Sequence, residues 1–156
     1  MLEDIGIFAT NQLIENADAH LPKSVQSVLD ARVKDDFKAA GRCLAFDLFT
    51  ASGFHSVRAV EAVARAYYKR LTNEDPDVGS GGTPLGPIIN SFRKERDVRK
   101  LPKDSPLDLI IGNLALMNNI YRKPLGHPQM VLATHDEAKK VFDLATVLIT
   151  LIAEQM

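Results

Sequence analysis

The sequence predicts an all-α protein, a bundle of four main helices with short accessory helices. Apolar residues recur at spacings of three and four along most of the chain, no segment alternates strictly between apolar and polar residues, and several helix starts carry capping signals. The chain has 156 residues, 46% hydrophobic and 25% charged, as in an ordinary globular domain with one core. We expect an accessory helix over residues 1–20 and the bundle over residues 21–156.

The first half of the chain predicts two long helices after the accessory helix. The accessory helix is expected to end before Leu21, because the residue that precedes a proline avoids the helical region. Ser24 is the expected N-cap of a helix that ends near Thr50, with an apolar face formed by Leu29, Val33, Phe37, Ala40, Leu44 and Leu48. A helix over residues 51–71 follows, with a stripe formed by Phe54, Val57, Glu61, Ala64, Tyr68 and Leu71. This stripe therefore includes one carboxylate.

A segment rich in glycine and proline, residues 73–87, predicts a loop. A short helix over residues 85–94 and a basic connector are expected after it. Ser105 and Pro106 then open a third main helix in the N-cap and N1 pattern, and Pro124 is expected to end it.

The third and fourth main helices carry clear packing and capping signals. The third has a second apolar face, so we expect it to pack on two sides; this face is formed by Leu109, Leu116 and Ile120. The fourth begins with a capping box between Thr134 and Glu137 and is expected to extend to about Ile152.

Composition excludes several classes of protein. Nineteen basic and 20 acidic residues give a formal charge of -1, so the chain has no overall bias toward nucleic acids or anionic membranes. Cys43 is the only cysteine, which excludes an internal disulfide. Apolar runs fall far short of the roughly 20 residues of a membrane span, and the acidic N-terminus is unlike a secretory signal. We expect a cytoplasmic protein that does not contact membranes.

The common motifs of cofactor and metal sites are missing from the sequence. The glycine-rich segment GSGGTPLG lacks both the phosphate-loop ending and the dinucleotide spacing. The chain has no Glu-x-x-His pair for a di-iron centre, no cysteine set for zinc and no nucleophile elbow around a serine. We therefore expect no metal and no cofactor.

The segment RKPLGH, from Arg122 to His127, lies between the third and fourth main helices. An arginine at a helix end carries a permanently charged guanidinium whose forked N–H donors can bind phosphate. A nearby histidine titrates near neutrality and can transfer a proton. Such a pair suits metal-free cleavage of RNA, in which a base deprotonates the ribose 2'-OH and cations hold the charge on phosphorus. A homodimer would bring two pairs together.

This segment resembles the signature of HEPN domains, helical bundles in which an Arg is followed by a His at such a junction. The chain is most similar to bacterial HEPN-like proteins, through RKPLGH, the helix FHSVRAVEAVARAYY and the ending HPQMVLATHDEAKKVFDLA, over about residues 21–156. The resemblance implies a HEPN-like helical bundle and a dimeric, metal-independent endoribonuclease of toxin or antiphage systems, with Arg122 and His127 as catalytic residues. The resemblance also implies a partner protein, either a cognate antitoxin or another protein of a defence system.

Further residues are expected to support this site or to bind RNA. Tyr121 and Lys123 flank Arg122. Arg58 and Glu61 would orient the pair if they approach it. For Glu61 the favoured interpretation is a structural partner of an arginine, because an unpaired carboxylate in an apolar stripe is costly. The segment from residue 93 to 103 has six basic residues against two acidic ones, namely Arg93, Lys94, Arg96, Arg99, Lys100 and Lys103. It would follow a phosphate backbone or serve as a solvated connector.

Two alternatives to the nuclease stay open. One is a non-catalytic HEPN-like module that binds a nucleotide, a nucleic acid or a protein partner; it is favoured by Lys123, where the family usually has Asn or Asp. The other is a structural helical dimer in which RKPLGH is only a turn. Tyr67 and Tyr68 are expected in the core or the dimer interface, and His55 and His135 at the surface or near caps.

Overall fold

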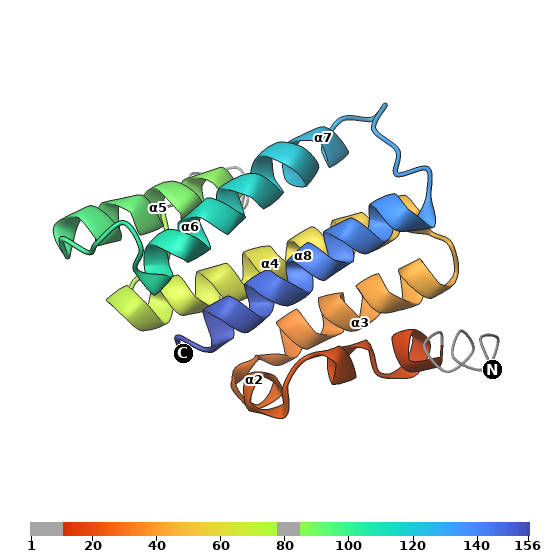
Figure 1. Ribbon diagram of the computed structural model, residues 1–156, viewed down its shortest axis with the longest axis horizontal. Coiled ribbons are helices and arrows are strands. Elements are labelled where there is room, and N and C mark those ends of the chain that lie inside the picture. Colours follow the sequence, from red (N-terminus) through yellow and green to blue (C-terminus); the bar gives the residue numbers. More distant parts are fainter. Residues whose placement is uncertain (1–10, 78–84) are drawn as a thin grey trace.

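The computed structural model of the protein describes residues 11–77 and 85–156, and the regular secondary structure in these ranges is entirely helical (Figure 1). This confirms the all-α class. Residues 11–15 are helical. The other elements are η1 (Ala17–His20), α2 (Lys23–Val28), α3 (Ala31–Ala45), α4 (Phe49–Thr72), α5 (Leu85–Val98), α6 (Pro106–Met117), η2 (Asn118–Arg122), α7 (Lys123–Leu125) and α8 (His135–Ala153).

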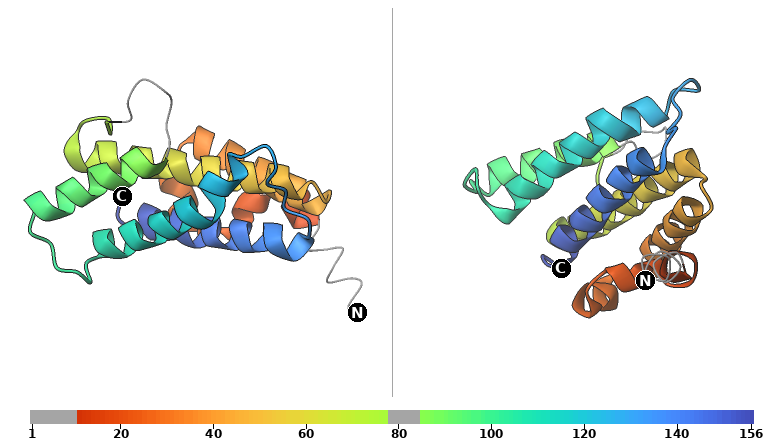
Figure 2. Two further views of the ribbon diagram at one scale, coloured as in Figure 1. Left: turned by 90° about the horizontal axis from the view of Figure 1, so that it is seen from above. Right: turned by 45° about the vertical axis from the view of Figure 1, so that its right-hand side comes forward.

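The helices are stacked in three layers (Figures 1 and 2). The pair α5 and α6 forms one outer layer, α4 and α8 form the middle layer, and α3 with α2 lies on the other side. A single core runs through all three layers, and its largest fully buried side chains include Phe37, Phe92, Leu114 and Ile149. The middle layer therefore contacts both outer layers, and α4 contributes to every part of the core.

The predicted helix from Ser24 to Thr50 is wrong, because the segment is divided between α2 and α3, α3 already ends at Ala45, and α4 begins at Phe49. Leu29 has extended backbone angles (φ -78°, ψ 136°), and the Asp30 carboxylate accepts a hydrogen bond of 3.1 Å from the Val33 N–H at the start of α3. Ser24 lies inside α2 and does not cap it. Leu29 is nevertheless buried, so the break keeps the expected apolar residue in the core.

The predicted helix over residues 51–71 is confirmed as α4. Two residues expected on apolar faces are exposed instead: Phe54 on α4 (41% exposed) and Leu48, which precedes α4 (57% exposed). The glycine-rich part of the predicted loop lies outside the described residues, as does the first half of the predicted accessory helix, residues 1–10. Residues 11–20 pack on α3, where Ala17 is fully buried beside Gly41.

The helix α5 is longer than predicted and ends at Val98 instead of Lys94. Arg96 is therefore helical as well as Arg93 and Lys94, and the predicted basic connector starts only at Arg99. The added turn includes Arg96, which pairs with the Asp108 carboxylate at 2.7 Å. The left-handed backbone of Lys100 (φ 54°) follows the end of the helix.

The start of α6 is as predicted, with the Ser105 hydroxyl accepting a hydrogen bond from the Asp108 N–H. The expected end at Pro124 is wrong. The chain widens into the π-helical turn η2, in which the Lys123 N–H donates to the Asn118 carbonyl, and then continues as α7. Pro124 lies in the first turn of α7, directly after the π turn.

The second apolar face of the α6 segment does not pack against another described helix. Leu109, Leu116 and Ile120 are 54%, 44% and 49% exposed, so the expectation of packing on two sides is not met within one chain. The start of α8 is as predicted, because Thr134 and Glu137 form the full capping box. No helix within residues 11–77 and 85–156 is long and apolar enough to cross a membrane.

Candidate functional site

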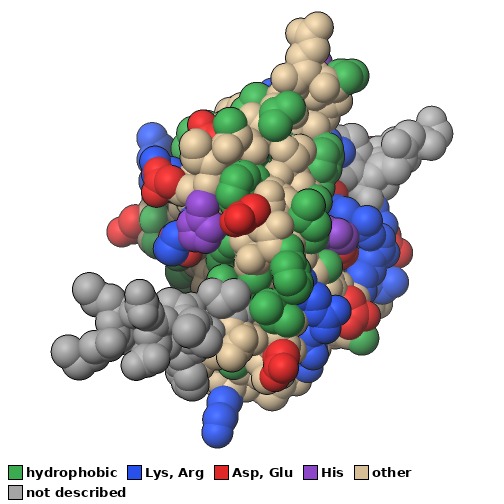
Figure 3. Space-filling model, turned by 90° about the vertical axis from the view of Figure 1, so that its right-hand side faces the viewer, with side chains coloured by type: hydrophobic (Ala, Val, Ile, Leu, Met, Phe, Trp, Pro, Cys, Tyr) green, Lys and Arg blue, Asp and Glu red, His purple; other side chains and the backbone are tan. Residues whose placement is uncertain are grey.

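The RKPLGH segment forms the end of a continuous helical stretch and the turn after it. Arg122 is the last residue of η2, and His127 follows α7 at the start of the loop that leads to α8 (Figure 1). In Figure 3, which views the molecule from the side on which α7 lies, histidine side chains lie among basic, acidic and apolar ones. The predicted junction therefore lies at one end of the bundle.

Arg122 is held in place by Glu61 on α4. Its Nε donates a hydrogen bond of 2.9 Å to Glu61 Oε1, and the side chains of the pair are 34% and 14% exposed. The carboxylate also accepts a backbone hydrogen bond from Leu85 at the start of α5. Glu61 thus links three helical segments, and the structure brings together two residues that are 61 positions apart in the sequence.

Burial raises the pKa of Glu61 above its usual value, and four contacts partly counteract this effect. In order of size these are the hydrogen bond from Arg122, the charge of Arg122, the Leu85 backbone N–H and the charge of Arg58. The Arg122 guanidinium is therefore the main group that stabilises the ionised carboxylate. Loss of Arg122 would leave a largely buried acid without its principal partner.

The turn after Arg122 presents His127 to solvent. The His127 N–H donates to the Pro124 carbonyl (2.9 Å), and the His127 carbonyl accepts from the Met130 N–H (3.0 Å). A Cβ atom added at Gly126 would lie 3.4 Å from Nη1 of Arg122, so the guanidinium lies over the residue that precedes His127. Among the described residues, the exposed imidazole has no hydrogen-bond or ion-pair partner.

This arrangement combines a fixed cation with a free titratable group. A guanidinium that uses Nε for Glu61 still has both Nη groups to bind two oxygens of one phosphate. The solvent-exposed imidazole of His127, on the turn that follows, is a group that can accept or donate a proton. The geometry thus suits recognition of a phosphate group together with proton transfer.

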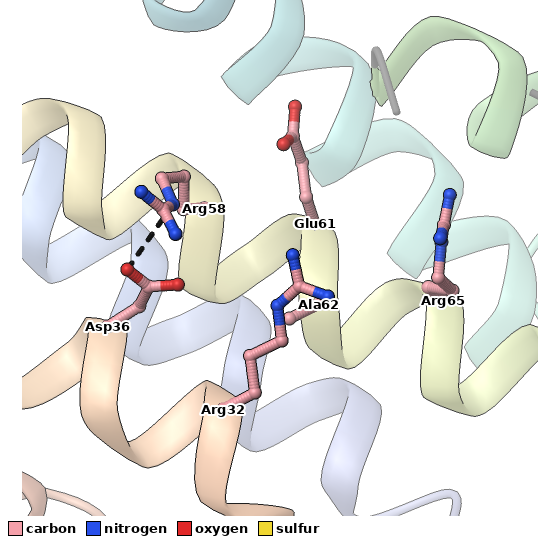
Figure 4. Close-up of a pocket in the computed structure, with 6 residues that line it drawn as sticks. All are labelled: Arg32, Asp36, Arg58, Glu61, Ala62 and Arg65. Atoms are coloured by element: carbon pink, nitrogen blue, oxygen red, sulfur yellow. Dashed lines mark ion pairs between the residues drawn. The ribbon is translucent and has the colours of Figure 1, made fainter. Parts of the chain in front are cut away.

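Arg58, expected to support this pair, binds a different carboxylate. Its Nε lies 3.4 Å from Oδ1 of Asp36 on α3, and Nδ1 of His55 lies 3.0 Å from the same oxygen. In Figure 4 Arg58 turns toward Asp36, whereas Glu61 points away from α3. Arg58 therefore reaches the Arg122 site only through its charge, and His55, expected at the surface, is a half-buried partner of Asp36.

Asp36 was not predicted from the sequence, although a signal for it exists. Its side chain is only 9% exposed. Asp36 follows Val33 by three residues and precedes Ala40 by four, which places it on the apolar stripe of α3. With Arg58 and Glu61 it borders a hollow of about 120 Å³ between α3 and α4, lined by Arg32, Asp36, Arg58, Glu61, Ala62 and Arg65.

The residues that flank Arg122 differ in their surroundings. Tyr121 is partly buried and packs against the core. Lys123 is exposed, and its Nζ donates to Oδ1 of Asn119 at 3.2 Å. Lys123 lines a groove between α5 and the α6–η2 segment and shares it with Arg93 of the basic segment.

The six basic residues of the predicted RNA-binding segment do not act as one set. Arg96 pairs with Asp108 and Asp97, and Arg99 pairs with Glu95 and donates to the Leu71 carbonyl at the end of α4 (2.9 Å). These two stabilise the fold. The remaining four have no ion pair with the described residues, namely Arg93, Lys94, Lys100 and Lys103.

In the part of the chain that the structure describes, no group of three or more His, Cys, Asp or Glu side chains is arranged to hold a metal ion. Comparisons of the chain with protein-family models, curated proteins and solved structures found no match. The resemblance to HEPN domains therefore depends only on the sequence segments that suggested it, namely RKPLGH, FHSVRAVEAVARAYY and HPQMVLATHDEAKKVFDLA.

Proposed function

We propose that the protein is a metal-independent endoribonuclease of the HEPN type that acts as a homodimer. The observation that supports this proposal is the position of Arg122, which is bound to Glu61 and lies over the turn that exposes His127. A toxin or antiphage effector in the cytoplasm, controlled by a cognate antitoxin or another defence protein, belongs to the same proposal.

In this proposal the imidazole of His127 removes the proton of a ribose 2'-OH. The 2'-oxygen then forms a bond to the adjacent phosphorus, the bond from phosphorus to the 5'-oxygen breaks, and that oxygen takes up a proton. Arg122 binds the non-bridging oxygens as their charge grows. The products are a 2',3'-cyclic phosphate and a 5'-hydroxyl.

A homodimer would complete such a site. One histidine cannot lie on both sides of the phosphorus, so His127 of the second copy would supply the proton for the leaving oxygen. The exposed stripe of Leu109, Leu116 and Ile120 supports this arrangement, because steps of seven and four place these residues on one helix face. The stripe ends two residues before Arg122, so an interface through it would lie near the end of the helical segment that carries Arg122.

The test is cleavage of labelled total RNA and tRNA in EDTA by the full chain and by the variants His127→Ala and Arg122→Ala. Matched controls are His20→Ala and Arg70→Ala, which remove an exposed histidine and an exposed arginine outside this segment. We expect at least a hundredfold loss in each site variant and wild-type rates in the controls. Absence of wild-type cleavage, or cleavage that persists in both site variants, contradicts the proposal.

A second candidate function is a non-catalytic module that binds a phosphate-bearing ligand. It is favoured by Lys123, which lines the groove beside Arg93 and replaces the Asn or Asp usual in the family. This candidate predicts RNA binding without turnover in the same assay.

A further inference from the structure

The groove between α5 and the α6–η2 segment has the composition of an anion site with a polar wall. It has a volume of about 250 Å³ and is lined by Gly86, Ile89, Asn90, Arg93, Ala115, Asn118, Asn119 and Lys123. Two of these residues are cations, three are amides and none is a carboxylate. Since no acid lines the groove, its local charge is positive although the chain as a whole is nearly neutral.

Neither Arg93 nor Lys123 is paired with a carboxylate of the described residues. Arg93 Nη1 donates to Asn90 Oδ1 at 3.3 Å, and Lys123 Nζ donates to Asn119 Oδ1 at 3.2 Å. These partners are neutral, and neither cation forms an ion pair with a described residue. Arg96 on α5 and Arg99 directly after it are instead bound by carboxylates. Arg93 and Lys123 are therefore held toward the groove but remain able to bind an anion.

Asn118 provides an independent indication of a ligand. The residue is only 8% exposed, and its side-chain amide makes no hydrogen bond with any residue in the described ranges. A Cβ added at Gly86 would lie 3.9 Å from its Nδ2, so the amide lies opposite the first turn of α5. Its polar atoms still reach solvent through the groove, because Ser56 Oγ is the one fully buried side-chain N or O atom without a partner in the described ranges. A ligand that both accepts and donates hydrogen bonds would pair with this amide.

We propose that this groove binds one nucleotide of a single-stranded RNA. The phosphate lies between Arg93 and Lys123, and the base presents its hydrogen-bonding edge to Asn118, because an amide pairs with the donors and acceptors of base edges. Ile89 and Ala115 supply the apolar part of the wall. No aromatic residue lines the groove, so the base is recognised through its edge and not by stacking.

The position of the groove connects it to the Arg122 site. Lys123 follows Arg122 directly, and Asn118 is the first residue of the π turn that Arg122 ends. A strand with one nucleotide in the groove would therefore present a neighbouring phosphodiester to Arg122 and His127. The choice of RNA as ligand depends on the proposed function, whereas the phosphate and amide chemistry of the groove does not.

The test measures binding of a fluorescein-labelled single-stranded RNA heptamer by anisotropy, with the full chain carrying His127→Ala to prevent cleavage. We expect Arg93→Ala with Lys123→Ala to weaken binding at least tenfold, and Asn118→Leu to weaken it at least threefold. The matched control is Arg70→Ala with Lys23→Ala, which removes one exposed arginine and one exposed lysine that do not line the groove. The control is expected to change binding less than threefold.

Competition distinguishes a nucleotide site from a simple anion site. We expect AMP to displace the heptamer at a concentration at least tenfold below that of inorganic phosphate, and Asn118→Leu to abolish this difference. Equal competition by phosphate would contradict base recognition. Should Asn118→Leu fail to fold, the double variant of exposed Arg93 and Lys123 still decides whether the groove binds the phosphate.

The outcomes separate this inference from the nuclease proposal. If RNA cleavage requires Arg122 and His127 but the groove variants bind RNA like the wild type, the proposed nucleotide site is contradicted and the nuclease proposal stands. Binding that requires Arg93, Lys123 and Asn118 without any cleavage would support the groove and overturn the nuclease. Equal loss in the groove variant and its control, or no RNA binding at all, would overturn the groove.

Discussion

The ion pair between Glu61 and Arg122 should contribute measurably to stability, unlike most ion pairs on protein surfaces. Exposed pairs contribute about 0–1 kcal/mol, whereas breaking a fully buried pair costs about 3–5 kcal/mol. The Glu61 side chain is 14% exposed and that of Arg122 is 34% exposed, so this pair lies between the two cases. We expect a coupling energy of about 2 kcal/mol, which corresponds to about 4–8 °C in Tm for a chain of this size.

The two single substitutions should differ in cost. In Glu61→Ala the freed guanidinium of Arg122 can turn to water, because a third of that side chain is already exposed. In Arg122→Ala the freed carboxylate of Glu61 stays largely buried and loses the main group that stabilises its charge. Arg122→Ala should therefore be the more destabilising change at neutral pH.

The assay is urea unfolding, followed by circular dichroism, of the wild type, Glu61→Ala, Arg122→Ala and the double variant. The control cycle uses Lys139 and Asp143, an exposed pair one turn apart on α8, for which about 0.5 kcal/mol or less is expected. A coupling energy between Glu61 and Arg122 no larger than that of the control would refute the reasoning. The same result would remove the basis for a fixed Arg122 in the site.

The same pair predicts a dependence on pH. Because the folded-state pKa of Glu61 is raised above its usual value near 4.5, its contribution to stability is fully present below that pH and is lost as the pH rises through the folded-state pKa. The free energy of unfolding of the wild type relative to Glu61→Gln should therefore decrease from about pH 4.5 upward. In Arg122→Ala the loss should extend to higher pH, since the groups that lower the pKa are fewer. An unchanged profile in Glu61→Gln contradicts this assignment.

Two further predictions concern the core and the exposed α6 stripe. Gly41→Ala should lower the free energy of unfolding by about 1–3 kcal/mol, because the new Cβ would lie 2.4 Å from Ala17 Cβ and 2.9 Å from the Leu13 carbonyl oxygen. Gly112→Ala, whose Cβ would meet nothing within 4 Å, should instead raise the free energy of unfolding by up to about 1 kcal/mol. Urea unfolding in which both variants change stability by the same amount would be inconsistent with this packing. Leu116→Lys should weaken self-association in sedimentation velocity without lowering Tm, whereas Val98→Lys, at a 76% exposed position on α5, should leave it unchanged. A wild type that sediments as a monomer at all concentrations would contradict pairing through this stripe.

Helix starts were predictable where the signal is local. The N-cap of α6 and the capping box of α8 involve residues within one turn, so the sequence specifies them without reference to the rest of the fold. The break at Leu29 was missed because the apolar spacing continues across it, although the Asp30 cap was also a local signal. The extension through Pro124 was missed because a π turn and contact with α4 decide it: a Cβ at Gly53 would lie 3.1 Å from Cδ1 of Leu125.

The sequence by itself determined the helical class, the two capped helix starts and the candidate residues Arg122, His127 and Glu61, because spacing and capping act between near neighbours. Tertiary structure alone decided which charges meet. Arg58 and Glu61 are one turn apart on α4, yet Arg58 binds Asp36 on one side and Glu61 binds Arg122 on the other. It also placed Arg93, Asn118 and Lys123 around one groove. Such pairings depend on how helices pack, and the periodicity of a single helix carries no information about its neighbours.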